Sequence, residues 1–142
     1  MDALTIYRIG NWLYRKRIPV LPKIFQLIIF FMFNCYIPYQ TKIGPGCKIG
    51  HRGIGVVINK DAELGVNVLI RAHVTIGKKN SEEPAPIIGD NVTLGDGCKV
   101  LGDITVGNNV IIGANAVVVK DVPDDSIVVG VPAKVIGTVK NA

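Results

Sequence analysis

Two histidines are the side chains of this sequence best suited to acid–base chemistry. His51 and His73 are the only 2 histidines among the 142 residues of the chain. An imidazole can accept and return a proton near neutral pH, so either could serve as a general base toward a hydroxyl group. Two histidines are too few for a zinc site built from three histidines of one chain. We therefore expect proton transfer, with no bound metal.

The cysteines point to a reducing compartment. The chain has 3 cysteines, an odd number, and they form no CxxC motif. This pattern argues against a disulfide framework or a zinc knuckle and indicates a cytoplasmic protein. Cys47 and Cys98 stand where small inward-facing residues are expected, so we interpret both as core side chains.

The elements that must position the histidines follow a period of six residues. Aliphatic side chains recur at this spacing, with one gap of two periods: Ile58, Leu64, Ile70, Ile76, Ile88, Leu94, Val100, Val106, Ile112 and Val118. A small or aliphatic residue usually lies two positions earlier, which is the alternation of a strand. Glycine often follows, as suits a tight corner with a permissive backbone. Three short strands and three corners, about 18 residues, make one triangular coil, and stacked coils bury a continuous aliphatic core.

His51 lies where this period is broken. Ile43 and Ile49 keep the six-residue spacing but are offset by three residues from the later repeats. Such a break pushes the backbone outward, where a side chain can meet a ligand. Counting corners places His73 at the same edge of the solenoid, one coil away, which is about 4.8 Å. An exposed histidine at a corner without a catalytic role is the alternative for each.

Composition divides the chain into an N-terminal helical segment, residues 1–40, and a repeat domain, residues 41–142. All aromatic residues lie in the first part, and all but one of the 16 glycines lie in the second. The first part carries five basic residues and one acidic residue, so most of the net charge of +5 belongs to it. The pattern predicts helices over residues 1–17 and 24–36, separated by Pro19 and Pro22.

Three roles are open for the N-terminal segment. It could cap the first coil, pair trimers, or contact a membrane surface through residues 1–37. Its longest apolar run, residues 24–37, is shorter than the roughly 20 residues that cross a bilayer, and no secretory cleavage site follows it. The repeat domain is nearly neutral, which argues against a nucleic-acid partner.

The repeats resemble those of left-handed parallel β-helix acyltransferases. Residues 41–137 are most similar to bacterial serine acetyltransferase and its relatives in polysaccharide clusters, in the stretches KIGPGCKIGHRGIGVVI, VTIG, KVLGDITVGNNVIIGANAVV and VPDDSIVVGVPAKVIG. The resemblance implies a mainly β, left-handed parallel β-helix that acts as a homotrimer. It further implies an acetyl-CoA-dependent O-acetyltransferase in which His51 is the general base.

The resemblance also assigns the remaining site residues. His51 would face the acceptor hydroxyl. The family usually has a small polar residue where His73 stands, and the corner count alone suggests His73 as a second polar group facing the acceptor. A groove between neighbouring β-helices would hold CoA, where small residues let pantetheine approach and lysines meet phosphates. Its residues are Gly77, Gly95, Gly113, Ala114, Lys120 and Lys134. The interruption over residues 78–86, KKNSEEPAP, is expected to form a protruding loop near the histidine edge that helps close the site between subunits.

The sequence departs from serine acetyltransferase at the acceptor side. Tyr36 and Gly50 stand where the family places two aspartates near its catalytic histidine. Pro84 and Ala85 stand where it has the Arg-His pair that holds the amino-acid carboxylate. These changes favour another hydroxyl acceptor, such as a sugar in capsular or exopolysaccharide synthesis. A non-catalytic trimeric scaffold is the alternative from another class.

Overall fold

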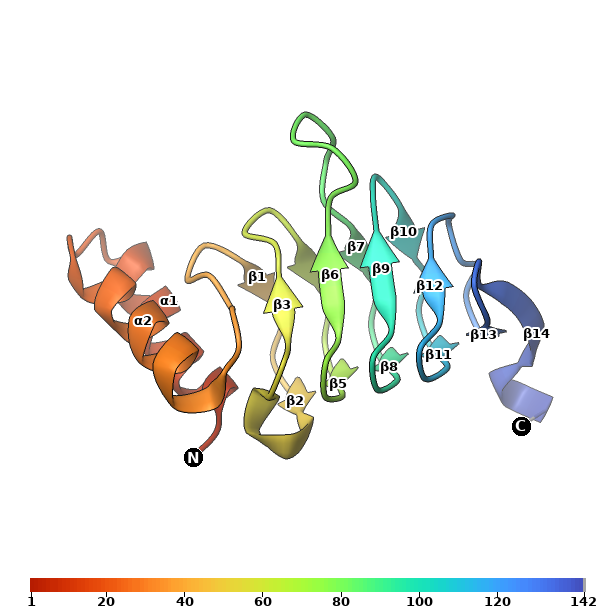
Figure 1. Ribbon diagram of the computed structural model, residues 1–142, viewed down its shortest axis with the longest axis horizontal. Coiled ribbons are helices and arrows are strands. Elements are labelled where there is room, and N and C mark those ends of the chain that lie inside the picture. Colours follow the sequence, from red (N-terminus) through yellow and green to blue (C-terminus); the bar gives the residue numbers. More distant parts are fainter. Residues whose placement is uncertain (142) are drawn as a thin grey trace.

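The computed structural model describes residues 1–141 and consists of two helices at one end of a stack of short strands (Figure 1). The helices are α1 (Ala3–Arg15) and α2 (Leu21–Phe33). The strands form three sheets that face one another around the solenoid. Sheet A contains β3 (Val57–Ile58), β6 (Thr75–Gly77), β9 (Lys99–Leu101) and β12 (Val117–Val118). Sheet B contains β1 (Lys42–Ile43), β4 (Glu63–Leu64), β7 (Ile87–Ile88) and β10 (Thr105–Val106).

Sheet C completes the triangle and extends furthest along the solenoid. It contains β2 (Lys48–Ile49), β5 (Leu69–Ile70), β8 (Thr93–Leu94), β11 (Ile111–Ile112), β13 (Ser126–Val129) and β14 (Lys134–Thr138). Pairing is parallel from coil to coil, except that β14 runs antiparallel to β13 and is followed by the short helix η2 (Val139–Asn141). The chain thus winds through about four coils of the left-handed parallel β-helix that the repeats predict.

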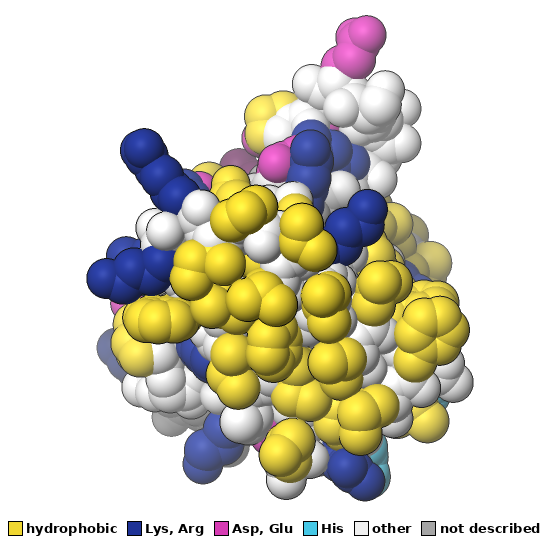
Figure 2. Space-filling view, turned by 90° about the vertical axis from the view of Figure 1, so that its left-hand side faces the viewer, with side chains coloured by type: hydrophobic (Ala, Val, Ile, Leu, Met, Phe, Trp, Pro, Cys, Tyr) yellow, Lys and Arg dark blue, Asp and Glu magenta, His cyan; other side chains and the backbone are white. Residues whose placement is uncertain are grey.

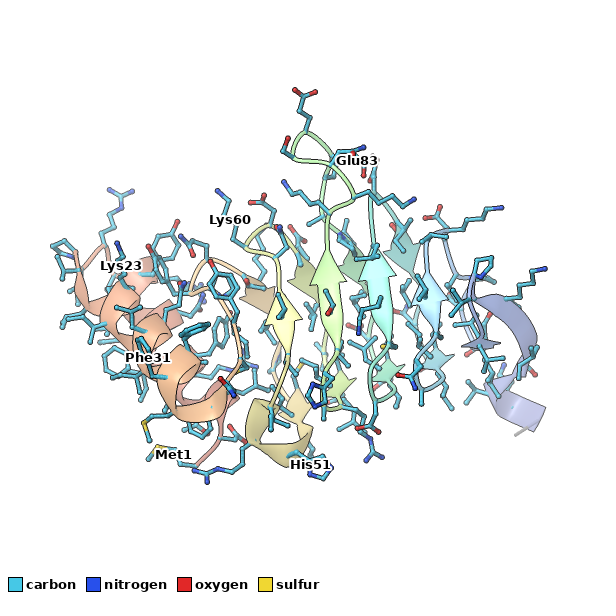
Figure 3. All side chains as sticks on the ribbon, in the orientation of Figure 1. Met1, Lys23, Phe31, His51, Lys60 and Glu83 are labelled. Atoms are coloured by element: carbon cyan, nitrogen blue, oxygen red, sulfur yellow. The ribbon has the colours of Figure 1, made fainter. Side chains whose placement is uncertain are left out.

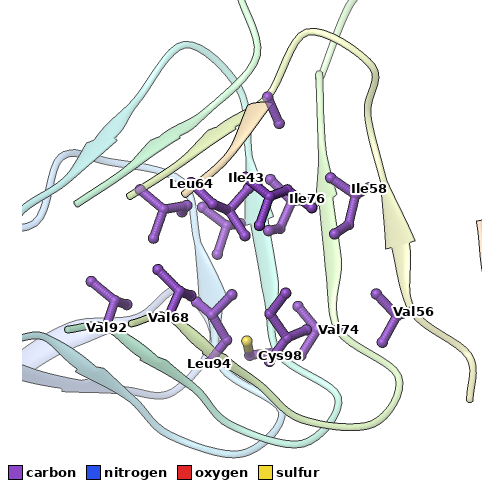
Figure 4. Packing of buried hydrophobic residues seen from close by; sticks show 14 of the residues in the cluster. Ile43, Val56, Ile58, Leu64, Val68, Val74, Ile76, Val92, Leu94 and Cys98 are labelled. Atoms are coloured by element: carbon purple, nitrogen blue, oxygen red, sulfur yellow. The ribbon is translucent and has the colours of Figure 1, made fainter. Parts of the chain in front are cut away.

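The core is the aliphatic column expected from the period of six (Figure 4). All ten in-phase aliphatic residues from Ile58 to Val118 are buried, none more than 4% exposed. The small residues two positions earlier are buried as well, including Cys98. Cys47 is only half-buried, and its Sγ donates to the carbonyl oxygen of Gly65 at 3.2 Å. Strand alternation therefore accounts for the inward residues of every coil.

The glycines that follow these aliphatic residues are explained by close packing between coils, and not by the permissive backbone that the sequence suggested. Gly65, Gly89 and Gly95 do not adopt left-handed φ angles. A Cβ on Gly65 would lie 2.7 Å from the carbonyl oxygen of Gly89, and one on Gly95 would lie 2.6 Å from that of Ile112. Glycine is required here because adjacent coils approach too closely for any side chain.

Asparagine supplies the left-handed residue at three successive corners between sheets B and C. Asn67, Asn91 and Asn109 have φ of 56° to 57° at successive corners between sheets B and C. Their amides form a ladder along the solenoid: Asn67 donates to Asn91 and Asn91 to Asn109, each at 3.3 Å, and Asn109 donates to Asp125 at 3.0 Å. Asparagine tolerates this conformation because its short polar side chain can hydrogen-bond locally.

Helix α1 caps the first coil, which confirms one of the three roles considered for the N-terminal segment. Asp2 begins the helix by accepting a hydrogen bond from the Thr5 N–H. Further along, the Tyr7 hydroxyl donates to the carbonyl of Thr41, and Arg8 donates to the carbonyls of Ile43 and Gly44. These bonds satisfy backbone oxygens at the open end of the solenoid.

Helix α2 packs mainly on α1 and begins earlier than the sequence predicts. It starts at Leu21 and includes Pro22 in its first turn, because a proline there removes no intrahelical hydrogen bond. Only Pro22, Ile29 and Phe33 of its 13 residues are buried. Within residues 1–141, no helix combines the length and apolar character needed to cross a membrane.

Candidate active site

The break in the repeat forms an outward turn between sheets C and A. The short helical turn η1 (Gly50–Gly53) follows β2, and three consecutive residues in it have left-handed φ angles: His51 at 47°, Arg52 at 63° and Gly53 at 103°. His51 and Arg52 are exposed. Left-handed φ is uncommon for residues other than glycine and costs about 1–2 kcal/mol per residue. The turn therefore holds the side chains of His51 and Arg52 outward, at a cost in backbone strain.

His51 lines a hollow between this turn and the end of α2. The hollow has a volume of about 320 Å³ and is lined by Phe31, Met32, Phe33, Asn34, His51, Arg52 and Ile54. The Arg52 guanidinium carbon lies 5.0 Å from the centroid of the Phe33 ring. An imidazole, a cation and an apolar wall therefore line one open concavity.

His73 lies at the same corner, one coil further along. Strands β2 and β5 pair in register, with Ile49 opposite Ile70, so the residues that follow them share an edge. The His73 N–H donates to the Ile54 carbonyl at 3.0 Å. Its ring covers Gly55, where a Cβ would lie only 2.0 Å from Nδ1. With φ of 58°, His73 occupies the left-handed corner position that Asn115 fills two coils later.

Two basic residues at this corner were not among the predicted site residues. Arg52 is adjacent to His51 and lines the same hollow. Lys99 extends its ammonium to the corner and donates to the carbonyls of Gly97 at 2.7 Å and His73 at 3.2 Å. Lys99 pairs with Thr75 across sheet A. Lys99 comes directly before an inward aliphatic residue and so points outward, and this position in the repeat is the sequence signal that could have identified it.

The loop over residues 78–86 does not lie near the histidines of its own chain, contrary to expectation. It follows β6 and precedes β7, so it projects at the corner between sheets A and B. Figure 3 shows Glu83 and His51 at opposite ends of sheet A. The strand order explains the error: a full strand of sheet A separates the histidine corner from the loop corner. Within the loop, Pro84 is exposed and Ala85 is buried.

The predicted CoA-binding residues border sheet A at both of its ends. Gly95, Gly113 and Ala114 follow β8 and β11 at the histidine corner, whereas Gly77 ends β6 and Lys120 follows β12 at the opposite corner. Lys134 begins β14 and is exposed.

The spaces around three of these glycines differ. A Cβ on Gly95 would come within 2.6 Å of the Ile112 carbonyl oxygen, so coil packing already requires glycine there. A Cβ on Gly113 would lie 2.7 Å from Cγ1 of Val129, so that side chain would have to move. At Gly77 the nearest atom would be 3.7 Å away, at Leu101, so a methyl group would fit there without a clash.

The cysteines are poorly placed for nucleophilic chemistry. Burial raises the pKa of Cys35 and of Cys98 to about 12, so both thiols stay protonated at neutral pH. Burial is also the main cause of the raised pKa of Cys47. In the described part of the chain, no group of three or more His, Cys, Asp or Glu side chains is arranged to hold a metal ion. The exposed histidines remain the groups suited to proton transfer.

Comparisons with known proteins agree with the fold and the repeat. Residues 85–120 match the bacterial transferase hexapeptide family (six repeats). A serine acetyltransferase of Synechococcus elongatus is 42% identical over 137 residues, which cover 95% of this chain and 56% of that protein. One of Helicobacter pylori is 40% identical over 138 residues, which cover 96% of this chain and 80% of that protein.

A solved structure of a serine acetyltransferase has the same fold as this chain. The serine acetyltransferase of Brucella abortus in complex with coenzyme A superposes with a TM-score of 0.90 at 32% identity, covering 96% of this chain and 55% of that one. The chain spans little more than half the length of the Synechococcus and Brucella proteins. Because the match to the Helicobacter protein covers most of both sequences, the chain belongs to the serine acetyltransferase family of hexapeptide-repeat proteins.

Proposed function

We propose that this protein is an acetyl-CoA-dependent O-acetyltransferase in which His51 is the general base. The observation that carries the proposal is the position of His51. It is exposed on a left-handed turn where the phase of the repeat shifts by three residues, and it lines a hollow large enough for part of an acceptor. Membership in the serine acetyltransferase family supports the same chemistry.

The reaction needs one proton to move twice. A ring nitrogen of His51 accepts the proton of the acceptor hydroxyl while its oxygen bonds to the thioester carbonyl carbon. The carbon–sulfur bond then breaks, and the departing CoA sulfur takes the proton from the imidazolium. The products are an acetyl ester and CoA with a free thiol. Arg52 and His73 lie beside this path, where they can orient polar groups of the acceptor.

CoA would lie along sheet A, and its site would be shared between chains of a homotrimer. An added Cβ at Gly77 would meet nothing closer than 3.7 Å, and Ala114, Lys120 and Lys134 are exposed. The Brucella relative that carries coenzyme A supports this assignment. The loop over residues 78–86 lies too far from the His51 of its own chain to close that site, so the loop of a neighbouring chain would do so.

The acceptor is serine or a sugar hydroxyl, and the site favours the sugar. Pro84 and Ala85 offer no charge to an amino-acid carboxylate. Tyr36 forms a backbone bridge to Val57 and brings no carboxylate toward His51. A sugar carries several hydroxyls and no obligatory charge, so it suits such a site. The protein would then acetylate a polysaccharide or its precursor in the cytoplasm, with its N-terminal helices against the inner face of the membrane.

Thiol release from acetyl-CoA tests the proposal. The wild-type protein should release CoA in the presence of a hydroxyl acceptor, and His51→Ala should lower the rate by roughly 10²- to 10⁴-fold.

The matched control is His73→Ala, which removes the other imidazole from the same corner. We expect a smaller loss that varies with the acceptor, and unchanged CoA affinity in both variants. Full activity of His51→Ala together with an inactive His73→Ala would reverse the two roles. Absence of thiol release with L-serine, nucleotide-linked sugars and lipid-linked sugars would favour the non-catalytic scaffold.

A further inference from the structure

The two N-terminal helices present a continuous apolar surface at the end of the molecule (Figure 2). We call it the outer helix face. Its members are exposed apolar residues of α1, of α2 and of the turn before α2: Ile9, Trp12, Val20, Leu21, Ile24, Leu27, Phe30, Phe31 and Met32. Phe31 is 78% exposed and Val20 is 71% exposed. A contiguous surface of this kind marks an interaction site.

The composition of α2 shows that this exposure is systematic. Ile24, Leu27 and Phe31 are spaced three and four residues apart, so they form one stripe along the helix. The helix is apolar on its buried side as well, and Lys23 is its only charged residue. A helix that is apolar all round is normally covered on every side. Helix α1 covers one side of α2, and the outer stripe is open.

Basic side chains surround the outer helix face. The Lys16 ammonium lies 6.0 Å from the centroid of the Trp12 ring. Arg17, Val20 and Lys23 line one hollow at another edge, and Arg52 lies over Phe33 at the far end of α2. The only acidic residue of the N-terminal segment, Asp2, is engaged in capping α1. The rim of the outer helix face therefore carries positive charge around an apolar centre.

We propose that the outer helix face binds the surface of an anionic lipid bilayer. Aromatic and aliphatic side chains would enter the boundary between headgroups and acyl chains, while the basic rim would meet anionic headgroups. A second copy of this chain fits less well, because a symmetric contact would bring Lys16, Lys23 and Arg52 against the same cations. No acidic residue of the face would compensate them.

Bilayer binding would also place the His51 hollow at the lipid boundary. Phe31 and Met32 belong to the outer helix face and also line the wall opposite His51. The hollow therefore opens beside the bound surface. Resting on the function proposed above, this geometry points to an acceptor hydroxyl carried on a membrane-anchored or amphiphilic molecule, such as a sugar attached to a lipid.

Flotation of the full chain with vesicles tests the docking directly. The protein should float with phosphatidylglycerol-containing vesicles in low salt, float poorly with pure phosphatidylcholine, and be released by high salt. Ile24→Ser with Leu27→Ser should lower partitioning at least about tenfold. Lys16→Gln with Lys23→Gln should lower it about fivefold for each charge removed.

Matched controls come from the opposite end of the solenoid. Val135 and Ile136 are 52% and 65% exposed on β14, against 43% for Ile24 and 48% for Leu27, so Val135→Ser with Ile136→Ser removes apolar groups that are at least as exposed. Lys140→Gln removes an exposed charge there. Both control proteins should float like the wild type. No flotation in low salt, or equal losses in the control variants, would overturn the proposal. The proposal would also be overturned if the wild type bound no lipid but formed an oligomer of twice the mass, and if Ile24→Ser with Leu27→Ser abolished that doubling.

The acceptor is tested separately with a decyl glycoside and the matching methyl glycoside. In the presence of anionic vesicles, the wild type should acetylate the decyl glycoside faster. Ile24→Ser with Leu27→Ser should lose that preference and keep its rate on the methyl glycoside. Equal rates on both glycosides with bound wild type would refute the lipid-carried acceptor. Vesicle binding without transfer to any acceptor would refute the proposed enzyme activity and leave the docking intact.

Discussion

Gly55→Ala probes the contact between the break in the repeat and His73. The new Cβ would lie 2.0 Å from Nδ1, 2.6 Å from Cε1 and 2.8 Å from Cγ of His73, so the imidazole must move. The φ of Gly55 is also +69°, where an alanine is strained by about 1–2 kcal/mol. Because His73 is exposed, its ring can turn away at a cost of about 0.5–1.5 kcal/mol. We expect the free energy of unfolding to fall by the sum, about 1.5–3.5 kcal/mol.

The two contributions separate in a double-mutant cycle. In a His73→Ala background the ring is absent, so Gly55→Ala should cost only the backbone strain of about 1–2 kcal/mol. Denaturant unfolding of the four proteins gives the coupling energy, which we expect at about 0.5–1.5 kcal/mol. Thiol release by the same proteins would show whether displacing the ring affects the acceptor. An identical loss in both backgrounds would refute the packing of His73 over Gly55.

Three further predictions concern stability. Burial raises the pKa of Tyr7 from 10.0 and that of Cys98 from 9.0, each to about 12. A raised folded-state pKa gives stability that is complete below the ordinary value and is lost as pH rises through the folded one, so the free energy of unfolding should fall from about pH 9 to pH 12. Tyr7→Phe should flatten the part above pH 10, as measured by urea unfolding. Gly95→Ala should lower the free energy of unfolding by about 2 kcal/mol or more because its Cβ meets the next coil. Gly77→Ala should leave thermal unfolding nearly unchanged but weaken CoA binding. Asn109→Ala should cost about 1–2 kcal/mol through strain and lost ladder bonds, and Asn109→Gly should cost less because only the bonds are lost; equal losses would contradict the left-handed assignment.

The repetitive part of the fold could be predicted in detail from the sequence. A period of six, with small residues two positions before each aliphatic one, identifies the inward side chains because alternation along a strand has a fixed period of two. The three-residue offset at Ile49 likewise located the turn that carries His51. The in-register pairing of β2 and β5 then brings His73 to the same corner, as the corner count predicts.

The features that could not be predicted depend on contacts between coils. Period alone does not tell a glycine needed for left-handed φ from one needed for close approach, as at Gly65. The position of the loop over residues 78–86 depends on which of three corners it leaves, and Lys99 reaches His73 only through the pairing of neighbouring coils. The start of α2 lies before the predicted one because proline ordinarily ends a helix, whereas Pro22 occupies the first turn, where it removes no intrahelical hydrogen bond.

The asparagine ladder has a consequence for how such a chain can vary in length. An extra residue between sheets B and C would displace one amide from a row in which each side chain bonds to the next coil. Between sheets A and B, by contrast, the loop over residues 78–86 already departs from the repeat while β7 keeps its register with β4 and β10. Insertions should therefore accumulate at that corner, and foreign peptides should be graftable there. At the corner that carries the asparagine ladder, insertions and deletions should be tolerated only when they add or remove a whole coil.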